Sequence, residues 1–219
     1  MVQEYFIGGV MPYITALLLI VGIIYRAYRW SKSPQILPWE IFPYPETTGA
    51  QLKYLLTEIL TQHALREHNR RMWIPALILH WGLYLVVIWV ILVLVGIQNA
   101  YYIGMLGAAG ILIGTIISLV IRLSTEIRRI TAFVEYFNLL FLLVLSVLGL
   151  STNFFEVVNR VYLYSLIMLS PKTDSFTTGS VATLFLVQLF LIYLPYNRMA
   201  HFFAKYFTYH QVKWGHPGH

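Results

Sequence analysis

Two of the seven histidines lie in or beside long apolar stretches, where an ionisable side chain is costly. His80 lies within residues 72–121, which carry no formal charge, and His201 closely follows the apolar stretch that ends near Asn197. An ionisable residue inside a membrane helix is a functional candidate by default. We therefore treat both as candidate metal ligands, with a polar contact between helices as the alternative for each. The remaining histidines lie in polar segments where solvation explains them: His63, His68, His210, His216 and His219.

The two histidines are expected at similar depth in a membrane. His80 follows Arg71 by nine residues, which places it about 13 Å along a helix axis at 1.5 Å per residue. His201 precedes Lys205 by four residues and comes just before an aromatic stretch typical of the membrane interface. Two neutral imidazoles that face each other from separate helices are the axial ligand set of a b-type haem iron.

Arg198 lies one helical turn before His201, on the same helix face and deeper in the membrane. A guanidinium at that depth needs an anion, and a haem propionate, Glu135 or a lipid phosphate can each supply it. Snorkelling of the side chain to the headgroups is the alternative. Gly82 and Gly149 are small enough to let a macrocycle or another helix come close.

The elements that must position these residues are membrane helices. Only 11% of the residues are charged, compared with about a quarter in soluble domains. The uncharged stretches predict an all-α membrane protein, a single domain over residues 1–219 with five transmembrane helices. Their expected bounds are residues 5–27, 72–97, 100–121, 134–155 and 175–206. A further apolar piece, residues 161–171, is too short to cross and is expected at the interface or against a neighbouring helix.

The distribution of basic residues predicts the orientation of the five helices. Thirteen of the 15 lysines and arginines fall on one side, and only Arg160 and Lys172 fall on the other. We therefore expect the N-terminus outside and the C-terminus in the cytoplasm. The net charge of +6 reflects these loops and does not indicate nucleic-acid binding. With no cysteine, the chain cannot itself ligate an iron–sulfur cluster through thiolates.

The cytoplasmic segment between the first two spans begins with a proline-rich stretch that cannot be helical throughout. Leucine and isoleucine then recur three or four residues apart, which predicts an amphipathic helix over residues 46–70. This helix either lies on the membrane surface or forms a docking surface for a soluble subunit.

Several motifs resemble the cytochrome b (gamma) subunit family of respiratory nitrate reductase. They are Arg70-Arg71, His80-Trp81-Gly82, the Arg128-Arg129 loop, Tyr136-Phe137-Asn138, and the segment from Leu194 to His201 with its Pro-x-x-Arg-x-x-His pattern. The cytochrome b subunits of membrane-bound heterodisulfide reductase and of sulfite-reductase-linked menaquinol complexes are relatives of that family. The likeness covers most of the chain, from the basic segment before the second helix to the fifth helix.

The resemblance implies a subunit that relays electrons between a membrane quinone, menaquinone or similar, and a cytoplasmic iron–sulfur subunit. His80 and His201 fall at the ligand positions of the inner b haem, and Arg198 lies beside that haem. Val90 and Thr183 stand where the family has the histidine ligands of an outer haem. Because neither side chain ligates iron in the usual way, we expect one haem b, with the outer haem absent.

The resemblance also bears on location and partner. It implies the plasma membrane of a prokaryote and an iron–sulfur partner like that of heterodisulfide reductase or the nitrate reductase beta subunit. The chain would then be a non-catalytic or quinone-reactive subunit of an oxidoreductase complex in a respiratory chain. A haem-free membrane anchor is the main alternative. A small transporter is disfavoured, because the uncharged stretches contain no acids and the chain has no inverted repeat and no paired broken helices.

Overall fold

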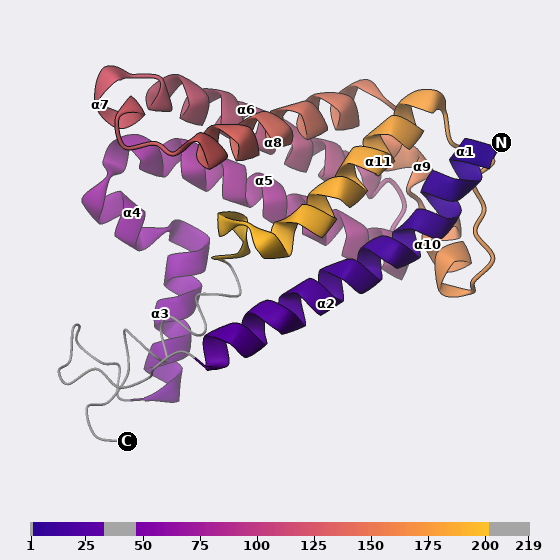
Figure 1. Ribbon diagram of the computed structural model, residues 1–219, viewed down its shortest axis with the longest axis horizontal. Helices are drawn as coiled ribbons and strands as arrows, with labels where there is room; N and C mark the ends of the chain where they lie inside the picture. The colour runs from indigo at the N-terminus through magenta and orange to yellow at the C-terminus, as the bar shows by residue number, and fades with distance from the viewer. Residues whose placement is uncertain (1, 33–46, 202–219) are drawn as a thin grey trace. The chain divides into compact units, whose positions relative to one another are not determined.

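The computed structural model describes residues 2–32 and 47–201, and every regular element in that part of the chain is helical (Figure 1). The α-helices are α1 (Val2–Tyr5), α2 (Met11–Ser31), α3 (Thr48–Thr61), α4 (His63–His68), α5 (Arg70–Val95), α6 (Tyr101–Arg122), α7 (Thr125–Arg128), α8 (Phe133–Ser151), α9 (Phe154–Val157), α10 (Arg160–Ile167) and α11 (Thr178–Tyr193). A π-helix, η1 (Phe6–Val10), joins α1 to α2, and two 3₁₀ turns, η2 (Leu194–Tyr196) and η3 (Arg198–Ala200), follow α11.

Five helical stretches are long and apolar enough to cross a membrane, which confirms the predicted all-helical multi-pass architecture. They are Val2–Ser31, Arg70–Val95, Tyr101–Arg122, Phe133–Ser151 and Thr178–Tyr196. The first is longer than expected at both ends. The fourth ends four residues early, because Thr152 is extended and Phe154 begins the separate helix α9.

The fifth span differs most from the expected residues 175–206. It begins later because Thr177 and Ser180 cap the start of α11: the Ser180 hydroxyl accepts from the Thr177 backbone N–H at 2.8 Å. It also ends at a break. Pro195 cannot donate a backbone hydrogen bond, and Asn197 is extended with φ −120° and ψ 170°. Residues 202–206 of the expected helix lie outside the described residues.

The amphipathic segment is two helices rather than the single helix expected over residues 46–70. The break is at Gln62, whose backbone is left-handed with φ 50°. The Glu58 carboxylate then accepts from the backbone N–H of Ala64 at 3.0 Å and caps the first turn of α4. The predicted apolar face of α3 is exposed on the protein surface, at Leu52, Leu56, Ile59 and Leu60.

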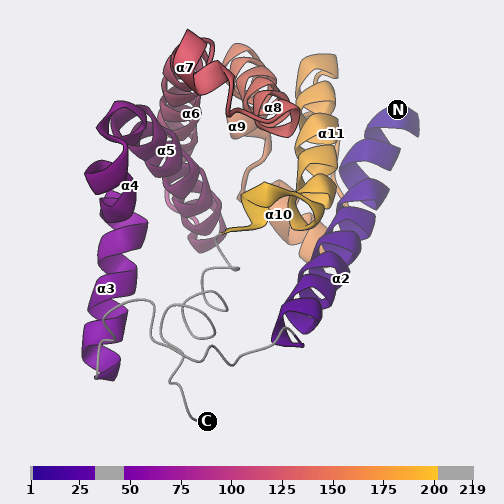
Figure 2. The same cartoon turned by 60° about the vertical axis from the view of Figure 1, so that its left-hand side comes forward.

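The chain divides into two compact units. The first comprises Met1–Met11 and Thr57–Val187, and the second Pro12–Leu56 and Gln188–His219. Within the first unit, α5 and α6 lie side by side and α8 packs against α6 (Figure 2). Within the second, Thr15 donates to the Gln188 side chain at 3.5 Å, and Gly22 lies against Pro195.

Glycines allow the backbones of α5 and α6 to approach closely. A Cβ added at Gly82 would lie 2.6 Å from the Ile111 nitrogen and 2.7 Å from the Gly107 oxygen. Gly114 approaches the other helix equally closely, since its Cβ would lie 2.6 Å from the Leu79 nitrogen. Small residues at such contacts are how membrane helices gain packing energy without a hydrophobic driving force between them.

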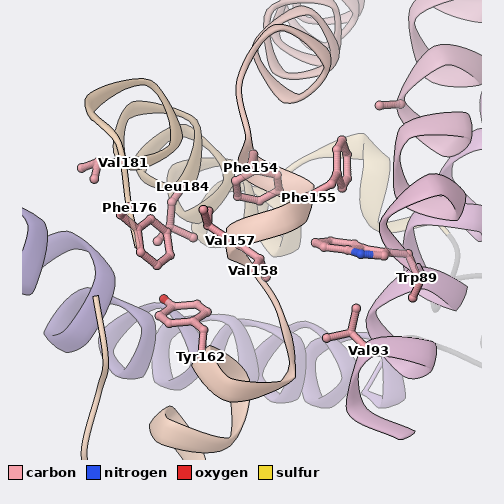
Figure 3. Close-up of a cluster of buried hydrophobic side chains, with 12 residues drawn as sticks. Trp89, Val93, Phe154, Phe155, Val157, Val158, Tyr162, Phe176, Val181 and Leu184 are labelled. Atoms are coloured by element: carbon pink, nitrogen blue, oxygen red, sulfur yellow. The ribbon is translucent and has the colours of Figure 1, made fainter. Parts of the chain in front are cut away.

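A cluster of buried side chains joins the ends of α5 and α11 in the first unit (Figure 3). Trp89 packs edge-on against Phe155, with ring centroids 4.8 Å apart. Between Trp89 of α5 and Leu184 of α11 lie the side chains of α9 and of the residue that follows it, Val158. The short segment expected at the interface or against a neighbour contains α10, whose Tyr162 is buried in this cluster.

The Tyr162 hydroxyl donates to the Gly8 carbonyl at 2.7 Å. In an α-helix that carbonyl would accept from the residue four positions on, but Pro12 has no N–H. The backbone next to this carbonyl is also irregular, since the Met11 N–H bonds to the Phe6 carbonyl five residues back, as in a π-helix. Tyr162 therefore satisfies a backbone group that the proline leaves without its helical donor.

Tyr162→Phe is expected to lower the free energy of unfolding by about 1–3 kcal/mol, the cost of leaving a buried carbonyl unsatisfied. Reversible unfolding in mixed detergent micelles measures the change. Tyr164→Phe is the matched control, because Tyr164 lies on the same short helix and is exposed. Equal stability of the two variants would contradict a role for the Tyr162 hydroxyl.

Candidate functional site

His80 lies on α5, ten residues after the helix begins, and is half-buried. Its Nδ1 lies 2.7 Å from the backbone oxygen of Ala76, one turn earlier. A carbonyl oxygen can only accept, so Nδ1 is the donor, and in the neutral form of the ring the lone pair is on Nε2. This is the tautomer in which histidine binds a metal through Nε2, with Nδ1–H held by a backbone carbonyl.

The sequence of α5 explains where His80 faces. The Asn69 side chain accepts from the Met72 N–H at 3.3 Å and caps the start of the helix. Leu79 and Gly82 face α6, as the glycine contacts show. His80 instead shares a face with Trp73 and Tyr84, seven residues before it and four after it. Both of these aromatic side chains donate to carbonyls of α3.

His201 is the last described residue and lies at the end of η3. Its Nδ1 lies 3.2 Å from the Arg198 carbonyl, so the same reasoning places its proton on Nδ1. The side chain is exposed on the protein surface. In both predicted ligands Nδ1 is directed at a backbone carbonyl, so Nε2 is the nitrogen that would coordinate a metal.

Arg198 differs from its expected setting. We expected it on a continuous fifth helix, on the same face as His201 and one turn deeper. The extended Asn197 breaks that helix, and Arg198 begins the 3₁₀ turn that His201 ends. The Asn197 side chain accepts from the Met199 N–H at 2.9 Å and stabilises this turn. The Arg198 side chain is exposed on the protein surface.

The two histidines belong to different units of the chain, His80 to the first and His201 to the second. The pairing of their imidazoles therefore stays a prediction. Glu135, one anion considered for Arg198, forms an ion pair with Arg122. The Tyr136 hydroxyl donates to the Arg122 carbonyl at 2.8 Å, so this corner joins the end of α6 to the start of α8.

The two glycines near the predicted haem are used for packing. Gly82 lies against the backbone of α6, and a Cβ at Gly149 would lie 3.2 Å from the Phe155 ring. The expected partner of each glycine was a macrocycle or another helix, and the structure places α6 against Gly82 and the Phe155 ring of α9 against Gly149.

Val90 and Thr183, the positions that correspond to outer-haem ligands, lie in packed surroundings. Val90 packs against the aromatic cluster of Figure 3. Thr183 is 1% exposed, and its hydroxyl donates to the Gly179 carbonyl at 2.9 Å. A second contact joins it to the Thr152 hydroxyl at 3.3 Å. Near Val90 and Thr183, the space between α5 and α11 is occupied by the side chains of α9 and by Val158.

A cavity of about 200 Å³ lies where α5 turns into α6. Gly96, Tyr101, Glu156 and Arg160 are among the residues that line it. Its nearest lining residue on α5, Val93, follows His80 by 13 residues, or about 20 Å along the helix. This cavity is therefore not a quinone pocket beside His80.

The remaining histidines do not form a second site among the described residues. His63 pairs with Glu67 at 3.1 Å, and His68 contacts the Ala64 carbonyl at 2.8 Å; both are exposed. His210, His216 and His219 lie outside the described residues. Within residues 2–32 and 47–201, no three histidine or carboxylate side chains gather to hold a metal ion. A haem requires fewer protein ligands, because its ring supplies four nitrogens and leaves only the axial positions.

Gln62 and the aromatic donors of α5 were not predicted from the sequence to lie in this region. Gln62 lies at the break between α3 and α4, and its amide reaches the same Ala76 carbonyl that holds His80. The spacing of Trp73 and Tyr84 seven residues before and four residues after His80 is a signal in the sequence that places all three on one helix face.

In comparisons with known proteins, no family model matches this chain, and no curated protein matches it.

Proposed function

We propose that the chain is a b-type haem membrane subunit of a respiratory complex in the plasma membrane of a prokaryote. It relays electrons between a membrane quinone, menaquinone or similar, and a cytoplasmic iron–sulfur partner. The observation that carries the proposal is the state of His80. A histidine inside the uncharged stretch of α5 has its Nδ1 2.7 Å from the Ala76 carbonyl, which leaves Nε2 as the ring nitrogen for a metal.

The residues fit the chemistry of such a haem. His80 and His201 would supply the axial nitrogens, and each has Nδ1 directed at a backbone carbonyl. That hydrogen bond fixes the tautomer and raises the basicity of the coordinating nitrogen. A bound b-type haem supplies one-electron redox chemistry, which links a two-electron quinone to one-electron iron–sulfur clusters.

A single haem is proposed. Val90 and Thr183 offer no imidazole, and the aromatic cluster with α9 fills the region between their helices. A single inner haem disfavours quinone chemistry at the outer face, which favours a quinone site near the cytoplasmic side.

The proposed orientation has the N-terminus outside and the C-terminus in the cytoplasm. Its support is the bias of basic residues, of which 13 of 15 fall on one side of the five spans. In this orientation the exposed apolar face of α3 lies on the cytoplasmic side. That face lies in the headgroup region or against the iron–sulfur partner.

Arg198→Ala is expected to leave the haem bound and to lower its midpoint potential. A positive charge near the iron favours the reduced form, and its removal shifts the equilibrium toward the oxidised form. A redox titration of the purified protein measures the shift. Arg160→Ala is the control, since Arg160 lies at the far end of α5 beside the cavity. An unchanged potential in Arg198→Ala would show that Arg198 does not tune the haem.

Anaerobic addition of a reduced menaquinone analogue to the purified full-length protein tests the proposed function. The expected result is the growth of the reduced absorption bands of a low-spin b haem. Bands that chemical reductants produce but quinol does not would contradict quinone reactivity. A protein without haem bands would support the haem-free anchor, in which His80 and His201 only hydrogen-bond to the protein.

A further inference from the structure

The junction between α3 and α4 is fixed to α5 by side-chain hydrogen bonds. Three aromatic side chains of α5 donate to three successive carbonyls at the end of α3. The pairs are Trp73 Nε1 to Thr61 at 2.7 Å, Trp81 Nε1 to Leu60 at 3.1 Å and Tyr84 Oη to Ile59 at 2.9 Å. Terminal carbonyls of a helix lack donors within the helix, so these contacts satisfy groups that the break at Gln62 would otherwise expose.

Gln62 itself has a backbone that most side chains avoid. Its φ of 50° is left-handed, which is uncommon for residues other than glycine, and it is only 9% exposed. Such a conformation persists when the surroundings determine it, and it is often found at functional positions. The left-handed turn ends α3 and leaves the amide of Gln62 beside α5, where Nε2 lies 3.4 Å from the Ala76 oxygen.

The Ala76 carbonyl therefore has two side-chain donors. His80 Nδ1 approaches it at 2.7 Å and Gln62 Nε2 at 3.4 Å. The helical ladder also assigns the backbone N–H of His80 to this oxygen. A carbonyl oxygen has only two lone pairs. Each additional donor therefore weakens the hydrogen bonds that the oxygen accepts from the other donors. The longer contact from Gln62 thus competes with the bond that orients the His80 ring.

We propose that Gln62 is a positioning residue for His80, acting through the shared Ala76 carbonyl. The inference rests on the proposed function, because its consequence is the tuning of an axial ligand. By sharing the acceptor, Gln62 limits the basicity that the Ala76 carbonyl confers on the imidazole. The α3–α4 junction, on the predicted cytoplasmic side, is thereby connected to the predicted haem ligand through one carbonyl oxygen.

The direction of the effect follows from this competition. Without the Gln62 donor, the Ala76 carbonyl accepts more strongly from Nδ1–H, and the His80 ring becomes a more basic ligand. A more basic axial ligand stabilises the oxidised iron, so the midpoint potential falls. The haem content stays at the native level, because His80 itself is unchanged.

Two variants remove the donor in different ways. Gln62→Met keeps the length of the side chain but has no N–H. Gln62→Asn tolerates the left-handed backbone but is one methylene shorter and loses the contact with Ala76. Trp73→Phe is the matched control, since it removes a donor from the same junction without touching the Ala76 carbonyl.

Midpoint potential and haem content are measured on the full-length protein, and nitrogen-15 shifts of the His80 ring on the haem-free protein. We expect both Gln62 variants to lower the potential and to move the Nδ1 shift toward stronger hydrogen bonding, with Trp73→Phe leaving both unchanged. Equal shifts of the potential and of the Nδ1 resonance in all three variants would mean that a loosened α3–α4 junction causes the shifts. No shift in the Gln62 variants would mean that Gln62 does not act on His80. Either result overturns the inference. Absence of haem from the native protein would refute the proposed function instead, while the nitrogen-15 shifts still test the contact.

Discussion

Replacing His80 with alanine is expected to abolish the b haem absorption bands while the protein remains folded in the membrane. Loss of one axial nitrogen should lower the haem content by more than about tenfold, since even changes to residues that support a ligand reduce metal affinity 10–100-fold. His80 is half-buried on the face of α5 that also carries Trp73 and Tyr84, whereas Leu79 and Gly82 face α6. The helices should therefore still form.

The measurement is the reduced-minus-oxidised spectrum of protein purified from haem-replete cells, normalised to protein content. His201→Ala should give the same loss, because it removes the second proposed ligand. His68→Ala is the control, since His68 is exposed and its Nδ1 lies 2.8 Å from the Ala64 carbonyl of the same short helix, α4. Native haem content in His80→Ala would mean that His80 has a structural role only.

Gly82→Ala is expected to lower the free energy of unfolding by about 3 kcal/mol, the upper end of the range for overpacking a well-packed interior. The added Cβ would lie 2.6 Å from the Ile111 nitrogen and 2.7 Å from the Gly107 oxygen. Both are backbone atoms, so neither can move aside as a flexible side chain can. The two helices must separate along their contact instead, which weakens the packing of the whole pair.

Unfolding in mixed detergent micelles, followed by circular dichroism, measures this loss. Gly49→Ala is the matched control, because nothing lies within 4 Å of an added Cβ at that helical position. That control should be neutral or slightly stabilising, since alanine favours the helix. A Gly82→Ala protein as stable as the native one would contradict the close backbone contact of α5 and α6.

The number and type of the membrane helices could be predicted from the sequence because hydropathy over about 20 residues is a local property. Residues 72–121 had to hold two helices, and the turn at Gly96 is where a left-handed residue ends α5. The short segment after the fourth span was expected either at the membrane interface or against a neighbouring helix, and the structure shows the second. Tyr162 makes this contact by bonding to the Gly8 carbonyl.

The breaks in the helices could not be predicted in the same way. The apolar repeat of residues 46–70 runs through Gln62, and its left-handed backbone is accompanied by contacts from Trp73 and Glu58 that join separate helices. The break at Asn197 depends on its own side chain, which caps the next turn. Each involves hydrogen bonds that an apolar repeat does not encode.

His80 was recognisable as a candidate because imidazole is costly in an apolar span. The nitrogen of His80 that donates could not be predicted from the sequence, because it depends on the position of the Ala76 carbonyl relative to the ring. Gly82 illustrates the reverse problem. A small residue near a candidate ligand fits a macrocycle or a helix equally well in the sequence, and only the contact with α6 distinguishes them.

The ratio of haem b to protein in the purified native chain is the most direct test of the central claim. A pyridine haemochrome assay with quantitative amino-acid analysis measures it. The predicted result is one haem per chain, ligated by His80 and His201. Two haems per chain would contradict the exclusion based on Val90 and Thr183, and no haem would contradict the electron-relay function itself.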